Sequence, residues 1–209
     1  YLETTIDADD YVGISSWSTT LLQTVEAMRS RPRKIANEVI QLIGGVGSPQ
    51  AQIQATRLVS HLAELTSAKP YYMGCPGLVA NPQIREAFLG DPAVKASIEA
   101  WDRLTTLLVG VGTFPASPLW QASGNALSRT EEKELSRAGA VGEICLRFFD
   151  INGLPMKPAI EERMISIEAE AMMAVPRRIG VAGGMRKLDA IRGAVAGGWI
   201  NVLITDADV

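Results

Sequence analysis

Short apolar runs alternate along this chain with longer stretches whose apolar positions recur at helical spacing. The runs are rich in Val, Ile and Leu with few polar residues among them, which is typical of strands covered on both faces. Runs of this kind predict strands at residues 11–15, 38–43, 70–73, 105–110, 144–149, 179–182 and 201–205.

The stretches between these runs have the periodicity of helices. They predict helices at residues 19–28, 50–66, 83–89, 93–101, 131–138, 168–174 and 186–196. In the second of them, Ile53, Leu58, Leu62 and Leu65 are predicted to share one buried side. Because strands and helices take turns, the crossovers should be right-handed and the sheet mostly parallel. The predicted fold class is α/β, with helices on both faces of the sheet.

Capping residues indicate where several helices begin. Ser128, followed three residues later by Glu131, has the spacing of a capping box, and Thr130 is an alternative cap for the same helix. Asn81 and Asp91 each stand directly before a proline, which is favoured at the first position of a helix.

Composition narrows the class of protein. A chain of 209 residues is long enough for one domain whose core needs no disulfide or metal. Lys and Arg number 20 against 23 Asp and Glu, so the net charge of −3 argues against binding nucleic acid through this chain's own surface. One histidine, His61, excludes a multi-histidine metal site, and we expect no cofactor. Two cysteines far apart in sequence fit a reducing cytoplasm.

The two ends and the apolar runs bear on the chain's location. No run approaches the roughly 20 apolar residues that a membrane span requires, and no signal-peptide pattern opens the chain. The first residue is Tyr1 instead of methionine, so we expect this chain to be a piece of a longer protein.

Small and hydroxyl residues follow several predicted strands, and ligands of parallel α/β folds bind at these carboxyl ends. Residues 15–20 (SSWSTT) offer hydroxyls and the first N–H groups of a helix, which suit a phosphate, or they simply cap that helix. Residues 44–48 (GGVGS) allow close backbone approach but match neither GxGxxG nor a P-loop. Gln54, on the following helix, would reach the same pocket.

Three more features point to the same edge of the sheet. Residues 110–113 (GVGT) open a long loop, rich in Pro, Ser and Gly, that we expect to order over a ligand. Lys187, after the sequence VAGG, either meets a phosphate or hydroxyl or is an ordinary surface lysine. Glu143 begins an apolar strand and either accepts hydrogen bonds from a polyol or is a structural carboxylate.

Catalytic motifs are missing from the sequence. It contains no GxSxG, CxxC or HExxH pattern and no kinase motifs, and His61 lies beside leucines on a predicted helix, where a structural role is expected. We therefore predict no catalytic residue.

The strand-end segments, in this order, resemble the effector-binding domain of the SorC/DeoR-type bacterial transcriptional regulators, the SorC sugar-binding family. The segments that carry the resemblance are GISSWSTTL at 13–21, QLIGGVGS at 41–48, LVGVGT at 108–113, GAVGEICLRFFDINGLP at 139–155 and RIGVAGGMRKLDAIRGAVAGGWINVLITD at 178–206.

This resemblance implies a Rossmann-like sheet similar to those of sugar-phosphate isomerases and glucosamine-phosphate deaminases. It implies that residues 1–209 bind an effector and form oligomers, and that a helix-turn-helix DNA-binding domain lies upstream, outside this chain. The expected partners are a sugar, a sugar phosphate or a related carbohydrate, DNA through the missing domain, and further copies in a dimer or tetramer. No membrane partner is expected.

The resemblance also implies an effector site. The residues that it places around a phosphate are Trp17, Ser18, Thr19 and Thr20, and those in the second glycine loop are Gly45 and Gly47. Gln54 would face the ligand, Glu143 would bind sugar hydroxyls, and Lys187 is the lysine after the AGG turn. Ser18 replaces a glycine of many relatives, and Glu143 replaces a more frequent aspartate. Ile43 stands where some bisphosphate-binding relatives have arginine, which favours a monophosphate or an unphosphorylated sugar or polyol.

The rival interpretation is a sugar-phosphate isomerase or deaminase on the same fold. Those reactions need a general base close to the reacting carbon. Only Glu143 with Lys187 could supply one here, so we expect a sensor domain and not an enzyme.

Overall fold

The computed structural model describes residues 1–29, 35–115 and 127–209. Most of the predicted long loop, residues 116–126, lies outside the described residues, so the expectation that it orders over a ligand is not addressed by the structure.

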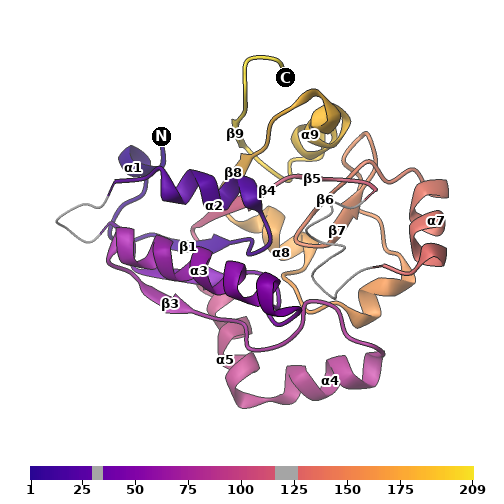
Figure 1. The fold of residues 1–209 in the computed structure, drawn as a ribbon, viewed down its shortest axis with the longest axis horizontal. Coiled ribbons are helices and arrows are strands. Elements are labelled where there is room, and N and C mark those ends of the chain that lie inside the picture. The colour runs from indigo at the N-terminus through magenta and orange to yellow at the C-terminus, as the bar shows by residue number, and fades with distance from the viewer. Residues whose placement is uncertain (30–34, 116–126) are drawn as a thin grey trace.

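The main sheet contains parallel strands in an order that reverses once. That order is β3 (Lys69–Tyr71), β2 (Glu38–Gln41), β1 (Tyr11–Ile14), β4 (Thr106–Gly110), β8 (Arg177–Val181) and β9 (Val202–Ile204) (Figure 1). Each neighbouring pair is parallel. The mostly parallel α/β sheet predicted from the alternation of apolar runs is therefore confirmed.

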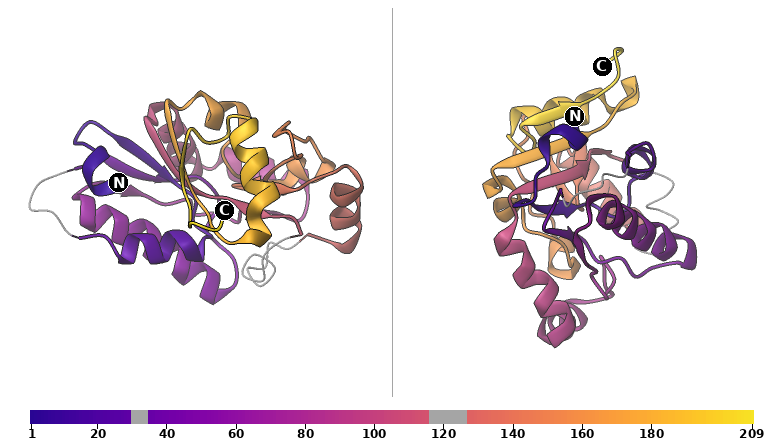
Figure 2. Two further views of the ribbon diagram at one scale, coloured as in Figure 1. Left: turned by 90° about the horizontal axis from the view of Figure 1, so that it is seen from above. Right: turned by 90° about the vertical axis from the view of Figure 1, so that its left-hand side faces the viewer.

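Helices cover both faces of this sheet, as predicted. One face packs on α1 (Leu2–Thr5), α2 (Thr19–Glu26) and α3 (Pro49–Thr66), and its core includes Val12 and Leu108. The other packs on a 3-10 turn at Ala100–Arg103, on α8 (Ala169–Ala174) and on α9 (Leu188–Ala196), around Leu107 and Met172. The two views of Figure 2 separate these layers, with α2 and α3 on one side of the strands and α8 on the other.

A second, antiparallel sheet lies beyond the carboxyl end of β4. It consists of β5 (Gly112–Thr113), β6 (Gly142–Ile144) and β7 (Arg147–Phe149). The single strand predicted over residues 144–149 is therefore wrong. Cys145 and Leu146 have positive φ angles of 53° and 66°, and two such residues in succession reverse the chain as a tight hairpin turn.

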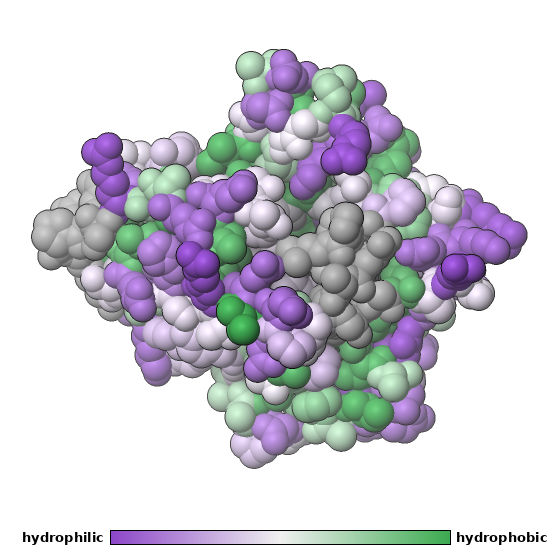
Figure 3. All heavy atoms as spheres, in the orientation of Figure 1, coloured by the Kyte–Doolittle hydropathy of each residue, from purple (hydrophilic) through white to green (hydrophobic). Residues whose placement is uncertain are grey.

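The predicted caps are largely confirmed. The Ser128–Glu131 capping box begins α7 (Arg129–Arg137), whose charged residues give a hydrophilic surface at the right of Figure 3. Thr130 lies inside that helix, so the alternative cap is wrong. The side chains of Asn81 and Asp91 accept backbone N–H groups at the starts of α4 (Pro82–Gly90) and α5 (Pro92–Glu99).

Two helix predictions need correction. Ile53 is 66% exposed, while Leu58, Leu62 and Leu65 are buried; five residues of helix turn Ile53 well away from the side of Leu58. The helix predicted from residue 186 begins at Leu188, after a 3-10 turn at Met185–Lys187. None of the helices in the described part of the chain has the length and apolar character that crossing a membrane requires.

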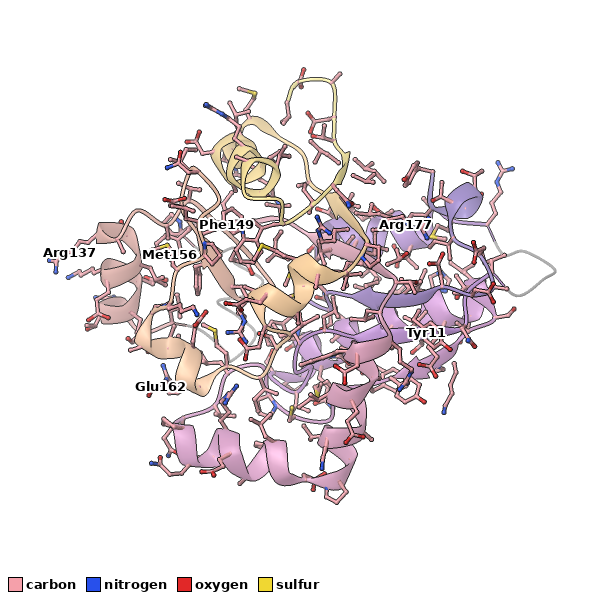
Figure 4. All side chains as sticks on the ribbon, turned by 180° about the vertical axis from the view of Figure 1, so that it is seen from behind. Tyr11, Arg137, Phe149, Met156, Glu162 and Arg177 are labelled. Carbon is pink, nitrogen blue, oxygen red and sulfur yellow. The ribbon has the colours of Figure 1, made fainter. Side chains whose placement is uncertain are left out.

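A network at the amino ends of the strands holds β1, β4 and β8 together. Arg177 Nη2 lies 2.5 Å from Asp10 Oδ2, and its Nε donates to Thr106 Oγ1 at 2.9 Å. Figure 4 shows Arg177 and Tyr11 at this end of the molecule, away from Phe149 and Met156 beside the second sheet. The amino edge is thus occupied by structural contacts.

Arg147 fastens the second sheet to the rest of the molecule. Its side chain is 2% exposed, and Nη1 lies 3.3 Å from Glu161 Oε1 and 3.0 Å from Glu168 Oε2. Its Nε and Nη2 donate to the carbonyl oxygens of Ile167 and Ser166, each at 3.0 Å. One guanidinium therefore holds β7 to the segment that enters α8.

Replacing Arg147 should destabilise the fold strongly. We expect Arg147→Met to lower the free energy of unfolding by about 3 kcal/mol, because it leaves carboxylates and buried carbonyls without their donor. Arg57→Met is the matched control: Arg57 is 63% exposed and pairs with Glu26 at 2.7 Å, so its loss should cost under about 1 kcal/mol. Urea unfolding of both variants measures the difference, and equal losses would contradict the assigned role of Arg147.

Candidate functional site

A cavity of about 410 Å³ opens at the carboxyl ends of β1 and β4. After β1 the chain winds through β2 and β3 on one side, whereas β8 and β9 follow β4 on the other. The loops leaving β1 and β4 therefore diverge and leave a crevice, which is where ligands bind in open α/β sheets. The described lining comes from residues 15 and 17–20, residues 110–113, Ile43, Lys187, and Glu143, Cys145 and Leu146 of the second sheet.

The start of α2 forms one end of the cavity. Ser18 is its N-cap, and its Oγ accepts the Leu21 N–H at 3.2 Å. Thr19 and Thr20 occupy the first turn and line the cavity. The first N–H groups of a helix have no partner within it and carry partial positive charge, so they attract anions. This end combines two hydroxyls with the N-terminus of a helix.

Close backbone contact brings the β1 and β4 loops together at this end. Ser15 Oγ accepts the Gly110 N–H at 3.1 Å. A Cβ atom at Gly110 would lie 2.7 Å from Ser18 Oγ, so only glycine lets the N-cap of α2 sit this close to the end of β4.

Trp17 forms part of the wall. It packs against a buried cluster that contains Ile43, Leu146 and Phe148. Its Nε1 is buried and has no hydrogen-bond partner among the residues that the structure describes. Since buried donors are nearly always paired, this indole N–H, on a residue of the cavity lining, is a candidate donor to a ligand.

Glu143 lies at the other end of the cavity. Its Oε2 accepts the Leu146 N–H at 2.8 Å, across the hairpin turn. A Cβ atom at Gly112 would lie 1.9 Å from its Oε1, so the carboxylate rests against the glycine backbone. Its enclosure raises the pKa of Glu143, while the Leu146 N–H and the charge of Lys187 act to lower it.

Lys187 enters the cavity beside this carboxylate. Its Nζ donates to the carbonyl oxygen of Val111 at 2.8 Å. Burial lowers the pKa of Lys187, and the nearby Glu143 carboxylate acts against that shift. The two side chains place a donor and an acceptor in the lining of one cavity, a combination that suits the hydroxyl groups of a carbohydrate.

The structure brings six of the nine site residues expected from the sequence to this cavity: Trp17, Ser18, Thr19, Thr20, Glu143 and Lys187. Gly45 instead lines a smaller hollow of about 150 Å³ with Gln41 and Tyr72. Gly47 and Gln54 are exposed, and neither is among the described residues of the two linings. β2 pairs with β1 on the side away from β4, so only the start of its loop, at Ile43, lines the crevice in the described part of the chain, and the glycines after it lead toward α3.

Several lining residues were not predicted as part of a site. Residues 110–113 were recognised as a strand end, but only the strand order shows that this end adjoins β1. Cys145 and Leu146 line the cavity because their left-handed turn places them there. Neither residue is a glycine or asparagine, so the sequence does not predict this turn.

Comparisons with known proteins identify the family and the fold of this chain. The family described as "Putative sugar-binding domain" matches residues 1–209. The deoxyribonucleoside regulator of Bacillus subtilis (strain 168) is 33% identical over 207 residues, which cover 99% of this chain and 64% of that protein. The sorbitol operon regulator of Klebsiella pneumoniae is 30% identical over 207 residues, covering 97% of this chain and 64% of that protein. The chain thus spans less than two thirds of the length of these relatives.

Solved structures show the same fold. The crystal structure of the full-length sorbitol operon regulator SorC from Klebsiella pneumoniae matches with a TM-score of 0.89 at 27% identity, over 99% of this chain and 66% of that one. The sugar-binding domain of the transcriptional regulator DeoR from Pseudomonas syringae pv. tomato matches with a TM-score of 0.74 at 35% identity, over 100% of this chain and 77% of that one. The chain belongs to this sugar-binding domain family, whose relatives here are SorC- and DeoR-type transcriptional regulators.

Proposed function

We propose that this chain is the effector-sensing part of a DNA-binding transcriptional regulator of carbohydrate metabolism. Its effector is the monophosphate of a sugar or polyol, bound in the cavity between α2 and the second sheet. A helix-turn-helix domain elsewhere in the intact protein contacts DNA, and the intact protein is a homo-oligomer. Binding of the effector changes the oligomeric state or the DNA affinity.

The observation that carries this proposal is the pairing of two chemistries in one cavity. The first turn of α2, with Thr19 and Thr20, suits a phosphate, while Glu143 and Lys187 suit hydroxyl groups. Ile43 also lines the cavity and offers no charge for a second phosphate. A ligand with one phosphate and several hydroxyls satisfies both ends.

The names of the relatives support this ligand class. They include a deoxyribonucleoside regulator, a sorbitol operon regulator and an erythritol catabolism regulatory protein. Each name refers to a compound with a sugar or polyol skeleton. By analogy, the effector of this chain belongs to the same chemical class.

The mechanism we propose is a shift between two arrangements of the intact regulator. A ligand can move such an equilibrium only by the difference between its affinities for the two states. A tenfold change in DNA affinity requires a coupling free energy of about 1.4 kcal/mol.

The enzyme interpretation has less support. His61, the one histidine of the sequence, lies on α3 with its side chain 36% exposed, 3.9 Å from Glu64. It is not among the described residues that line the cavity. The acid–base pair that the enzyme interpretation would need is then Glu143 with Lys187. Both side chains are already bonded to the backbone, at the Leu146 N–H and the Val111 carbonyl oxygen, which suits binding without turnover.

A thermal-shift screen tests the proposal. The panel contains erythritol, sorbitol, ribose and 2-deoxyribose together with their monophosphates. We expect at least one monophosphate to raise the melting temperature, since a ligand at 100 times its Kd stabilises the folded state by about 2.7 kcal/mol. No shift with any compound would contradict the proposal, and consumption of a sugar phosphate by the chain would favour the enzyme.

Lys187→Met should weaken binding of the most stabilising compound by about tenfold or more, a loss of about 1.4 kcal/mol, because the substitution removes the one cation of the described lining. Arg186→Met is the control, since Arg186 is exposed and lies outside the described lining. Isothermal titration gives both affinities. Equal Kd values for Lys187→Met and wild type would remove Lys187 from the effector site.

Thr20→Val should weaken binding of a monophosphate more than binding of the parent sugar, because the lost hydroxyl lies at the anion end. The control is Thr24→Val, one turn further along α2, where the hydroxyl donates to the Thr20 carbonyl oxygen at 2.8 Å. If Thr20→Val weakened the two ligands equally, the phosphate would have to lie elsewhere.

A further inference from the structure

The segment after β9 folds against the glycine turn after β8. Asp206 Oδ2 accepts the Gly184 N–H at 2.5 Å. Its Oδ1 accepts the N–H groups of Asp208 and Val209 at 3.1 and 3.2 Å. One exposed carboxylate therefore joins the segment 206–209 to a turn that lies 22 residues earlier in the chain.

The two glycines of this turn fit Asp206 in different ways. A Cβ atom on Gly183 would lie 2.2 Å from Asp206 Oδ2, so the carboxylate rests against the bare Cα. Gly184 has a φ angle of 89°, in the region that favours glycine. The turn is thus shaped both to receive the carboxylate and to present an N–H group to it.

The same turn determines where Lys187 stands. The carbonyl oxygen of Gly184 accepts the Lys187 N–H at 2.8 Å and closes the 3-10 turn Met185–Lys187. α9 follows directly, and no side chain among the described residues caps its start. From this position Lys187 Nζ reaches the Val111 carbonyl oxygen in the cavity wall. Contacts thus run without a break from Asp206 through Gly184 to Lys187.

We propose that Asp206 is a positioning residue for the effector site: its carboxylate fixes the Gly183–Gly184 turn and thereby holds Lys187 in the cavity. The importance of Lys187 for ligand binding rests on the function proposed above, but its placement by Asp206 does not. The alternative is that Asp206 only fastens the residues that follow β9, in which case Lys187 keeps its place without it.

The experiment follows Lys187 directly by NMR in chains labelled with carbon-13 at lysine Cε, without any ligand. Lys187→Met identifies the signal. In the wild type we expect this signal to titrate at lower pH than those of the exposed lysines, because burial lowers its pKa. In Asp206→Ala the signal should join the exposed lysines in both chemical shift and titration, because Lys187 leaves the cavity.

Asp208→Ala is the matched control. It removes the same charge from the same segment, and Asp208 contacts the Asp206 carboxylate only through its backbone N–H, so Lys187 should titrate as in the wild type. Circular dichroism checks that each variant is folded. The inference is overturned if Lys187 already titrates with the exposed lysines in the wild type, or if Asp206→Ala leaves its signal unchanged. Since no ligand is present, a failed sugar-phosphate screen would refute the proposed function and leave this result standing.

Discussion

β1 pairs with β4 in parallel, Val12 beside Thr106 and Ile14 beside Leu108, and the two halves of the sheet are wound in opposite directions from this pair. The loops leaving these strands cannot both cross the same face, so the carboxyl ends of β1 and β4 remain uncovered by their own helices. Every part of the candidate site depends on this arrangement. The SSWSTT segment and the GVGT segment meet because of it, and the glycine loop after β2 is carried away from them.

The second sheet adds a carboxylate, Glu143, to the cavity between the strand ends. Its hairpin places Glu143 opposite α2, but only with Cys145 and Leu146 in left-handed conformations, which cost roughly 1–2 kcal/mol for each residue. The Leu146 N–H bonded to Glu143 and the buried guanidinium of Arg147 offset that cost. The orientation of the Glu143 carboxylate therefore depends on the strained turn, and the turn depends on the anchor that Arg147 provides in β7.

Features set by neighbouring residues could be predicted from the sequence, and features set by distant contacts could not. The caps Asn81, Asp91 and Ser128 act within three residues, and all three were found from spacing alone. Six of the expected residues line one cavity, in keeping with two sequence-level arguments: ligands bind at strand ends in this fold class, and the family resemblance selects among those ends. The turn at Cys145–Leu146 could not be predicted from the sequence, because its left-handed backbone is held by buried contacts and not by the conformational preferences of its residues.

The resting partner of Lys187 limits which ligands can bind. Its ammonium already donates to the Val111 carbonyl oxygen, at the junction between the main sheet and the second one. A ligand that recruits Lys187 must replace this hydrogen bond with one at least as favourable, because an unpaired charge inside the cavity is costly. Phosphate and hydroxyl oxygens meet that requirement, whereas an apolar metabolite does not. The same exchange would break the hydrogen bond that joins the turn before α9 to the residue after β4. Such a change is the kind of differential contact on which a sensor domain depends.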